Sequence, residues 1–200
     1  MPRARIAVGI VLTTLLLTAC SPRDFLTRRL AADLISGSTR FKVPQRFILQ
    51  TGVVSSKEYP SPESLVLQHR GWIAASAAPC PRELTPPPCW AILLTPSGVD
   101  AVRAALSPEQ TSASVITLPV ARREFVAVTG VAKDGKSADV EFSWRWNPLN
   151  EIGAALYSGD VRYKSIVGFR NYDDGWRMIE GVSHSSQSID DAIKNAEPIP

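Results

Sequence analysis

The most regular alternation of apolar and polar residues lies in the C-terminal half of the chain. Between residues 138 and 147 every second residue is apolar, from Ala138 to Trp146. Such a period of two is typical of a half-buried antiparallel strand. Asp134-Gly135 and Asp174-Gly175 are hairpin turn signals. We therefore expect strands at 115–129, 138–147, 160–170 and 176–181, and Pro119 places an edge or a bend in the first of them.

Helix signals dominate the N-terminal half. A helix is predicted from Ser21, which can serve as its N-cap, to Gly37, a typical stop. Its leucines recur at every fourth position (Leu26, Leu30, Leu34). Two further strands are predicted at 46–55 and 90–95. A helix at 61–70 would be capped by Ser61, with Pro62 next, and a helix at 97–106 would begin with Ser97 and Asp100 as a capping box. Two more helices are predicted at 149–156 and, on the surface, at 188–195.

These elements predict an α+β fold, in which helices pack on a curved antiparallel sheet of four to six strands. A sheet with one apolar face needs such a cover. The segment Tyr-Asp-Asp-Gly-Trp-Arg at 172–177 resembles the last hairpin of NTF2-like or cystatin-like domains, and the resemblance covers about residues 120–182. It implies a sheet whose helix-covered face can enclose a cavity. The chain also resembles bacterial lipoproteins of no assigned activity.

The first 21 residues resemble the signal peptide of a bacterial lipoprotein. Arg3 and Arg5 form a basic start, and an uncharged run of 14 residues follows at 6–19. This run is too short to span a bilayer, which needs roughly 20 apolar residues. It ends in Leu-Thr-Ala-Cys, which looks like a lipobox. An ordinary signal peptide with a cysteine by chance is the alternative.

The resemblance implies that residues 1–19 are removed and that Cys20 becomes the lipidated first residue of a single domain at 20–200. Ser21 follows the cysteine, where an aspartate would imply inner-membrane retention. We therefore expect the outer membrane, facing the periplasm, if the cell is Gram-negative. A helix starting at Ser21 would hold the domain close to the bilayer. Arg23, Arg28 and Arg29 would then lie near lipid phosphates or solvate the outer helix face.

Charge excludes one class of partner. The full chain carries a formal net charge of +3. Removing Arg3 and Arg5 with the signal peptide leaves 20 basic against 19 acidic residues, a net charge of +1. This near-neutral balance does not favour nucleic-acid binding, and the sequence has no cluster of lysines and arginines of the kind that binds nucleic acid.

Two cysteines remain once Cys20 is assigned to a lipid. Cys80 and Cys89 lie within a Pro-rich loop expected at about 75–89, and an exported protein usually oxidises such a pair. Neither histidine has zinc-finger spacing to them, so we expect a disulfide and no metal site. Thr85-Pro86-Pro87-Pro88 either presents a polyproline II face to a partner or only stiffens the loop.

Two groups of residues are candidates for ligand binding. Trp144 and Trp146 share one face of the strand at 138–147, where they line an apolar groove or fill the core. Arg170, Tyr172 and Trp176 surround the Asp174-Gly175 turn, where they contact a ligand or serve only the turn.

No catalytic set emerges from the sequence. His184 lies in a serine-rich segment with Asp190 and Asp191 nearby, but the chain has no Gly-x-Ser-x-Gly elbow, Walker loop or dinucleotide fingerprint. We therefore expect no cofactor. The sequence favours a non-enzymatic envelope lipoprotein that binds a partner protein or an apolar ligand at the membrane surface. The alternative is a cavity enzyme of the NTF2-like type, possibly hydrolytic.

Overall fold

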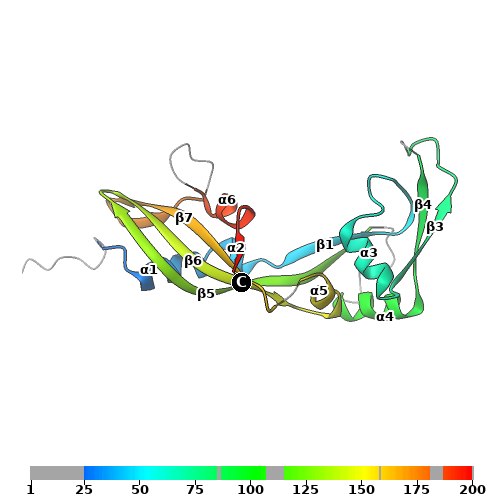
Figure 1. The fold of residues 1–200 in the computed structure, drawn as a ribbon, viewed down its shortest axis with the longest axis horizontal. Coiled ribbons are helices and arrows are strands. Elements are labelled where there is room, and N and C mark those ends of the chain that lie inside the picture. Colours follow the sequence, from blue (N-terminus) through cyan, green and yellow to red (C-terminus); the bar gives the residue numbers. More distant parts are fainter. Residues whose placement is uncertain (1–24, 85–86, 107–114, 158, 181–186, 200) are drawn as a thin grey trace, which may run out of the picture.

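The protein is an elongated arch of two lobes (Figure 1). The computed structural model describes residues 25–84, 87–106, 115–157, 159–180 and 187–199. Buried residues form two clusters, one in each lobe. A single long strand, β5 (Val115–Asp134), runs through both lobes and joins them.

A curled antiparallel sheet forms the first lobe and the junction. Its order is β1-β5-β6-β7-β8, and a sixth strand, β9, pairs with β7. This confirms the predicted α+β class with a curved sheet of up to six strands. Two register shifts between β5 and β6, at Phe125/Ala127 and Val128/Gly130, are irregularities of the kind that bend a sheet. The other bounds are β1 (Gln45–Gln50), β6 (Ser137–Pro148), β7 (Arg162–Tyr172), β8 (Gly175–Met178) and β9 (Glu197–Ile199).

Both predicted hairpin turns are present. Asp134 pairs with Ser137, and only the first residue between them, Gly135, has a positive φ (57°), which is the pattern of a type II′ turn. Between β7 and β8 the two central residues are Asp173 and Asp174, and Gly175 follows them with a φ of 119°. Asp174 itself has no positive φ, so the positive angle that this turn needs falls on glycine alone.

Three short helices cover the inner face of the curled sheet: α1 (Arg28–Ser36), α2 (Thr39–Lys42) and α6 (Ile189–Lys194). The prediction of one helix from Ser21 to Gly37 is wrong in its start. Residues 21–24 lie outside the described residues, and residues 25–27 are not helical. Thr27 caps α1, because its hydroxyl accepts a hydrogen bond from the Leu30 amide. The predicted surface helix also contributes to the core, since Ile189 and Ala192 are buried.

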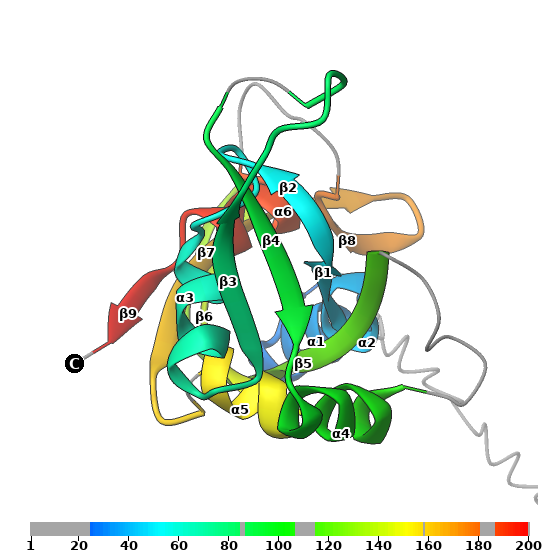
Figure 2. The ribbon, with the colours of Figure 1, turned by 90° about the vertical axis from the view of Figure 1, so that its right-hand side faces the viewer.

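The second lobe contains a separate three-stranded sheet. The strand predicted at 90–95 is confirmed as one of its members, whereas the strand at 73–78 and the division into two sheets were not predicted. The sheet has the order β2-β4-β3 and is formed by β2 (Gly52–Ser55), β3 (Ile73–Ala78) and β4 (Cys89–Leu94). Figure 2 shows this sheet facing the viewer. Gly52 has a φ of 90°, which divides the strand expected at 46–55 into β1 and β2. The Pro-rich loop is shorter than expected, because residues 75–78 belong to β3.

Three helices complete the second lobe: α3 (Pro62–His69), α4 (Pro96–Ala105) and α5 (Glu151–Leu156). The cap predicted for α3 at Ser61 is confirmed, and Ser64 completes a capping box that was not predicted from the sequence. The cap predicted for α4 at Ser97 is wrong. Thr95 occupies that position and accepts from the Gly98 amide, because Pro96 is better suited than Ser97 to the first helical turn.

Helix α5 is fixed to β5 where the two lobes meet. The Asn150 side chain accepts from the Gly153 amide and donates to the Pro119 carbonyl (2.7 Å). The Leu149 amide donates to the Val120 carbonyl. Pro119 pairs only with Arg46 of β1, because β6 pairs with β5 from Ala121 onward. At Pro119, β5 is therefore paired with β1 on one side and has no strand partner on the β6 side among the described residues, which is the edge position expected for a proline.

The predicted disulfide joins Cys80 to Cys89, with the Cα atoms 5.2 Å apart. Replacing both cysteines by serine should lower the free energy of unfolding by about 2.5 kcal/mol, because the bridge limits the freedom of the unfolded loop. Urea unfolding of the double variant, compared with the oxidised wild type, measures this loss. An unchanged midpoint would show that the prolines already constrain the loop enough.

Candidate functional site

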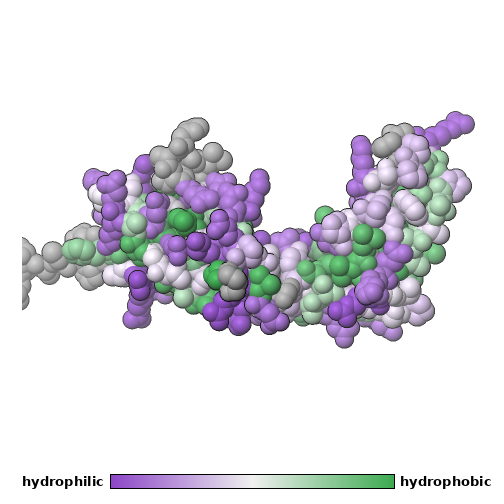
Figure 3. All heavy atoms as spheres, viewed as in Figure 1, coloured by the Kyte–Doolittle hydropathy of each residue, from purple (hydrophilic) through white to green (hydrophobic). Residues whose placement is uncertain are grey.

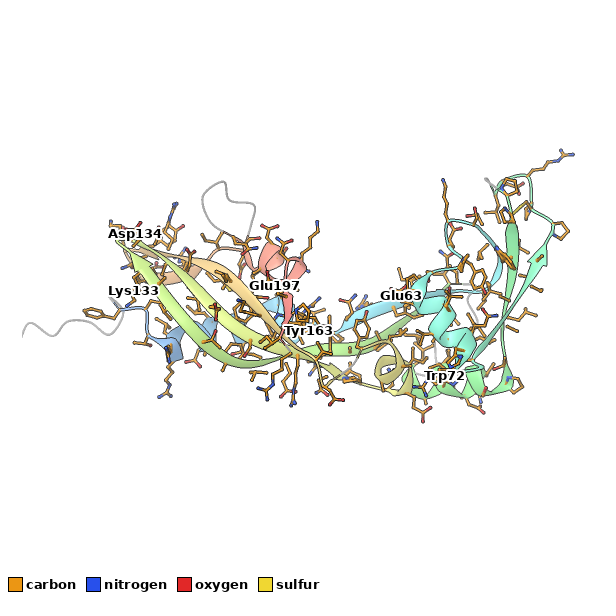
Figure 4. The ribbon with its side chains drawn as sticks, viewed as in Figure 1. Glu63, Trp72, Lys133, Asp134, Tyr163 and Glu197 are labelled. Atoms are coloured by element: carbon orange, nitrogen blue, oxygen red, sulfur yellow. A yellow bond between two sulfur atoms is a disulfide. The ribbon has the colours of Figure 1, made fainter. Side chains whose placement is uncertain are left out.

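Trp144, the first predicted binding residue, lies in the core of the curled sheet. Only 2% of its surface is exposed. Its ring stacks on Tyr163 at 4.7 Å, and its indole N–H donates to the Ser165 hydroxyl at 3.0 Å. Figure 4 shows Tyr163 at the junction of the two lobes. Trp144 therefore packs in the core, which is one of the two roles expected from the sequence. Its contact with a ligand stays a prediction.

Trp146 is only half-buried and belongs to a different environment. Its ring packs against Tyr157 (4.6 Å) and against the Arg123 guanidinium, whose Cζ atom lies 4.5 Å from the ring centroid. Burial lowers the pKa of Arg123, and the neighbouring Arg40 lowers it further. Burial also raises the pKa of Tyr157, with a further contribution from Glu63 of α3. A half-buried cation therefore lies beside an aromatic surface.

The second hairpin lies at the other end of β7 from the tryptophans of β6, since Arg170 pairs with Ser137 and Tyr163 pairs with Trp144. Trp176 is 7% exposed and packs in the core of the first lobe. Arg170 and Tyr172 are exposed, and the Tyr172 ring lies 5.3 Å from the guanidinium carbon of Arg177. Arg170 lines a shallow depression with residues of the first hairpin, including Asp134 and Asp139.

The other residues singled out in the sequence do not gather at a common site in the described structure. Cys20, Ser21, Arg23 and His184 lie outside the described residues. His69 is exposed at the end of α3. Within the described ranges, no three His, Cys, Asp or Glu side chains gather as metal ligands. The inner face of β6, where an NTF2-like enzyme would place polar groups, carries Val140 and Phe142, both fully buried.

An apolar pocket that the sequence did not reveal lies in the second lobe. It has a volume of about 240 Å³ and opens between β1, the β2–α3 connection and the inner face of the small sheet. Most of its lining is apolar: Phe47, Ile48, Leu49, Val54, Tyr59, Ile73 and Ile92. Figure 3 shows hydrophobic residues gathered on this lobe around α3. Gly52 separates β1 of the large sheet from β2 of the small sheet, and residues of both strands line the pocket.

The rest of the pocket lining is polar and consists of Gln50, Glu58, Ser61 and Ser64. Glu58 accepts hydrogen bonds from the Ser55 hydroxyl and from the Ser55 amide (3.0 Å). The bond from the hydroxyl lowers the pKa of Glu58. The Tyr59 hydroxyl donates to the Gln68 side chain, which leaves the tyrosine ring as the group presented to the pocket. An apolar interior with a few placed polar groups is the usual composition of a small-ligand site.

The outer face of the small sheet is a second unusual surface. Strand neighbours place Val53, Ala91, Leu93, Ala74 and Ser76 on this face. None of them is charged, and Leu93 is 62% exposed. In a sheet with one solvent-exposed face, the side chains on that face are normally polar. An exposed face without charged residues is therefore unusual.

Comparisons with protein families, with curated proteins and with solved structures found no match to this chain. Among the described helices, none combines the length and apolar character needed to cross a membrane.

Proposed function

We propose that this protein is an exported, lipid-anchored protein of the bacterial envelope that binds an apolar ligand. The basic start, the short apolar run and the lipobox ending in Cys20 support export and anchoring. The disulfide between Cys80 and Cys89 fits an oxidising compartment. The single observation that carries the binding proposal is the apolar pocket of the second lobe.

The pocket suits one apolar group rather than a large ligand. Its volume of about 240 Å³ lies just below the range of roughly 300–1,000 Å³ for typical small-molecule sites. A short acyl segment or a single aromatic ring is the class of group that fits. Ile48 is 58% exposed at this site, so apolar surface remains available to a ligand.

Binding can be tested with an uncharged apolar fluorophore, N-phenyl-1-naphthylamine. We expect its fluorescence to rise with the wild-type protein and to rise much less with Ile48→Glu, because a carboxylate in the lining disfavours an apolar ligand. Leu93→Glu is the matched control. It introduces the same charge at an exposed aliphatic residue of the same lobe, outside the pocket.

Equal fluorescence from the wild type, Ile48→Glu and Leu93→Glu would contradict an apolar ligand in this pocket. A loss with Leu93→Glu alone would place the fluorophore on the uncharged outer face of the small sheet. That face supports a second candidate function, the binding of a partner protein. Crosslinking in cells, compared between wild type and Leu93→Glu, distinguishes a partner on that face from a small ligand.

The anchoring proposal has its own test. Labelled palmitate should be incorporated into the wild-type protein and not into Cys20→Ser, because the lipobox places the acyl chains on this cysteine. Equal incorporation in both proteins would exclude Cys20 as the lipidation site.

A further inference from the structure

A basic depression lies at the junction of the two lobes, away from the apolar pocket. It is lined by Arg40, Arg123, Asp190, Ile193 and Lys194 and has a volume of about 200 Å³. The residues come from α2, from β5 and from α6, three elements that meet on the inner face of the curled sheet. Arg40 and Asp190 form an ion pair that joins α2 to α6.

Two cations in this depression have no acidic partner among the described residues. Asp190 is already paired with Arg40, and no ion pair involves Arg123 or Lys194 in the part of the chain that the structure describes. The formal charge of the lining is therefore +2. A doubly charged anion neutralises it, whereas a single carboxylate leaves one charge uncompensated.

The Arg123 guanidinium is held in place and incompletely satisfied. It packs against Trp146, and it donates long hydrogen bonds (3.3 Å) to the Arg40 carbonyl and to the Gln45 side chain. Its Nε atom is buried and has no hydrogen-bond partner in the described residues. A guanidinium that makes only two long hydrogen bonds in the described part of the chain gains from an anion bound in the depression that it lines.

From the geometry we infer that this depression binds a phosphate group. The planar guanidinium and the lysine ammonium match the oxygens of a phosphate, which carries between one and two negative charges near neutral pH. The inference concerns other residues than the proposed apolar site and does not depend on it. The phosphate can belong to a free anion, which compensates up to both positive charges, or to a phospholipid headgroup, whose phosphodiester compensates one of them.

One strand connects the two sites. Gln45, which contacts Arg123, and Phe47 and Leu49, which line the apolar pocket, alternate along the same face of β1. At the rise of a strand, Gln45 and Leu49 are about 13 Å apart. This spacing is within the length of a lipid molecule, so a phospholipid is one of the probes.

The test uses isothermal titration calorimetry of the full chain with inorganic phosphate, in phosphate-free buffer. We expect Lys194→Ala and Arg123→Gln each to weaken binding about tenfold or more, because each removes a charged donor. Arg103→Gln is the matched control, since it removes one positive charge from an exposed arginine of α4 in the second lobe. The same dissociation constant in all four proteins, or no binding by the wild type, would overturn the inference. If Arg123→Gln does not fold, Lys194→Ala decides alone, because Lys194 is exposed.

A second arm uses short-chain phosphatidylglycerol below its micelle concentration. Tighter binding than inorganic phosphate, weakened by Lys194→Ala, assigns a lipid headgroup to the site. Binding of inorganic phosphate alone assigns a free phosphate. Ile48→Glu separates this inference from the apolar ligand, because it leaves phosphate binding unchanged whether or not the fluorophore binds.

Discussion

Replacing Gly153 by alanine is expected to lower the free energy of unfolding by about 3 kcal/mol, a large effect for one methyl group. A Cβ atom at this position would lie 1.7 Å from the Val120 carbonyl oxygen of β5. That oxygen belongs to the backbone and already accepts a hydrogen bond from the Leu149 amide. Helix α5 therefore has to move away from β5, which disturbs the contact between the lobes.

The measurement is urea unfolding monitored by circular dichroism, with Gly130→Ala as the matched control. The nearest atom to a Cβ at Gly130 is the Glu141 Cβ at 3.6 Å, an ordinary contact. This control should change the free energy of unfolding by less than about 1 kcal/mol. If the two alanine variants were equally stable, the close approach of α5 to β5 would be refuted.

Trp144→Ala should be the more costly of two tryptophan truncations, with an expected loss of about 3–5 kcal/mol. The reason is that Trp144 is almost fully buried, stacks on Tyr163 and donates a hydrogen bond to Ser165. Trp146→Ala removes a half-buried ring and should cost less, because part of that ring already contacts water.

Thermal and urea unfolding of the two variants give the comparison, and Trp144→Phe serves as the intermediate case that keeps an aromatic ring. The outcome also bears on function. A Trp144→Ala protein as stable as the wild type would mean that the indole is not a core element, which would revive its assignment to a ligand groove.

The C-terminal sheet was predictable because its signals are local. The alternation in β6 and the two Asp-Gly turns determine strands and turns without reference to the rest of the chain. The apolar faces then need a cover, so helices on a curved sheet follow. The same holds for the helix that begins after Ser61, whose cap and proline lie side by side in the sequence.

The strand β4 was predicted, but β3 and the separation of a second sheet were missed, because their signals are weak and the pairing is not local. β3 consists largely of alanine, which has a low strand propensity, and its partner β4 lies beyond the Pro-rich loop. A positive φ at Gly52 cannot be read from the glycine alone, since glycine is also common in ordinary turns.

The candidate sites were missed for a related reason. The apolar pocket is formed by residues of β1, β2, β3, β4 and the segment before α3, so it exists only once two sheets are placed. The basic depression joins Arg40, Arg123 and Lys194, which are far apart in the sequence. The tryptophans of β6 were correctly seen as a pair, but only the structure separates the buried Trp144 from the half-buried Trp146.

The unbroken course of β5 gives the molecule a fixed reach. Arg28 of α1 donates a hydrogen bond to the Thr129 carbonyl in the first lobe, and about 45 Å of strand backbone separates Thr129 from Val115 in the second. With Cys20 lipidated as proposed, the five residues up to Phe25 can span at most about 17 Å. The attachment point thus stays near the first lobe, while a stiff arm rather than a flexible tether carries the apolar pocket several nanometres from it.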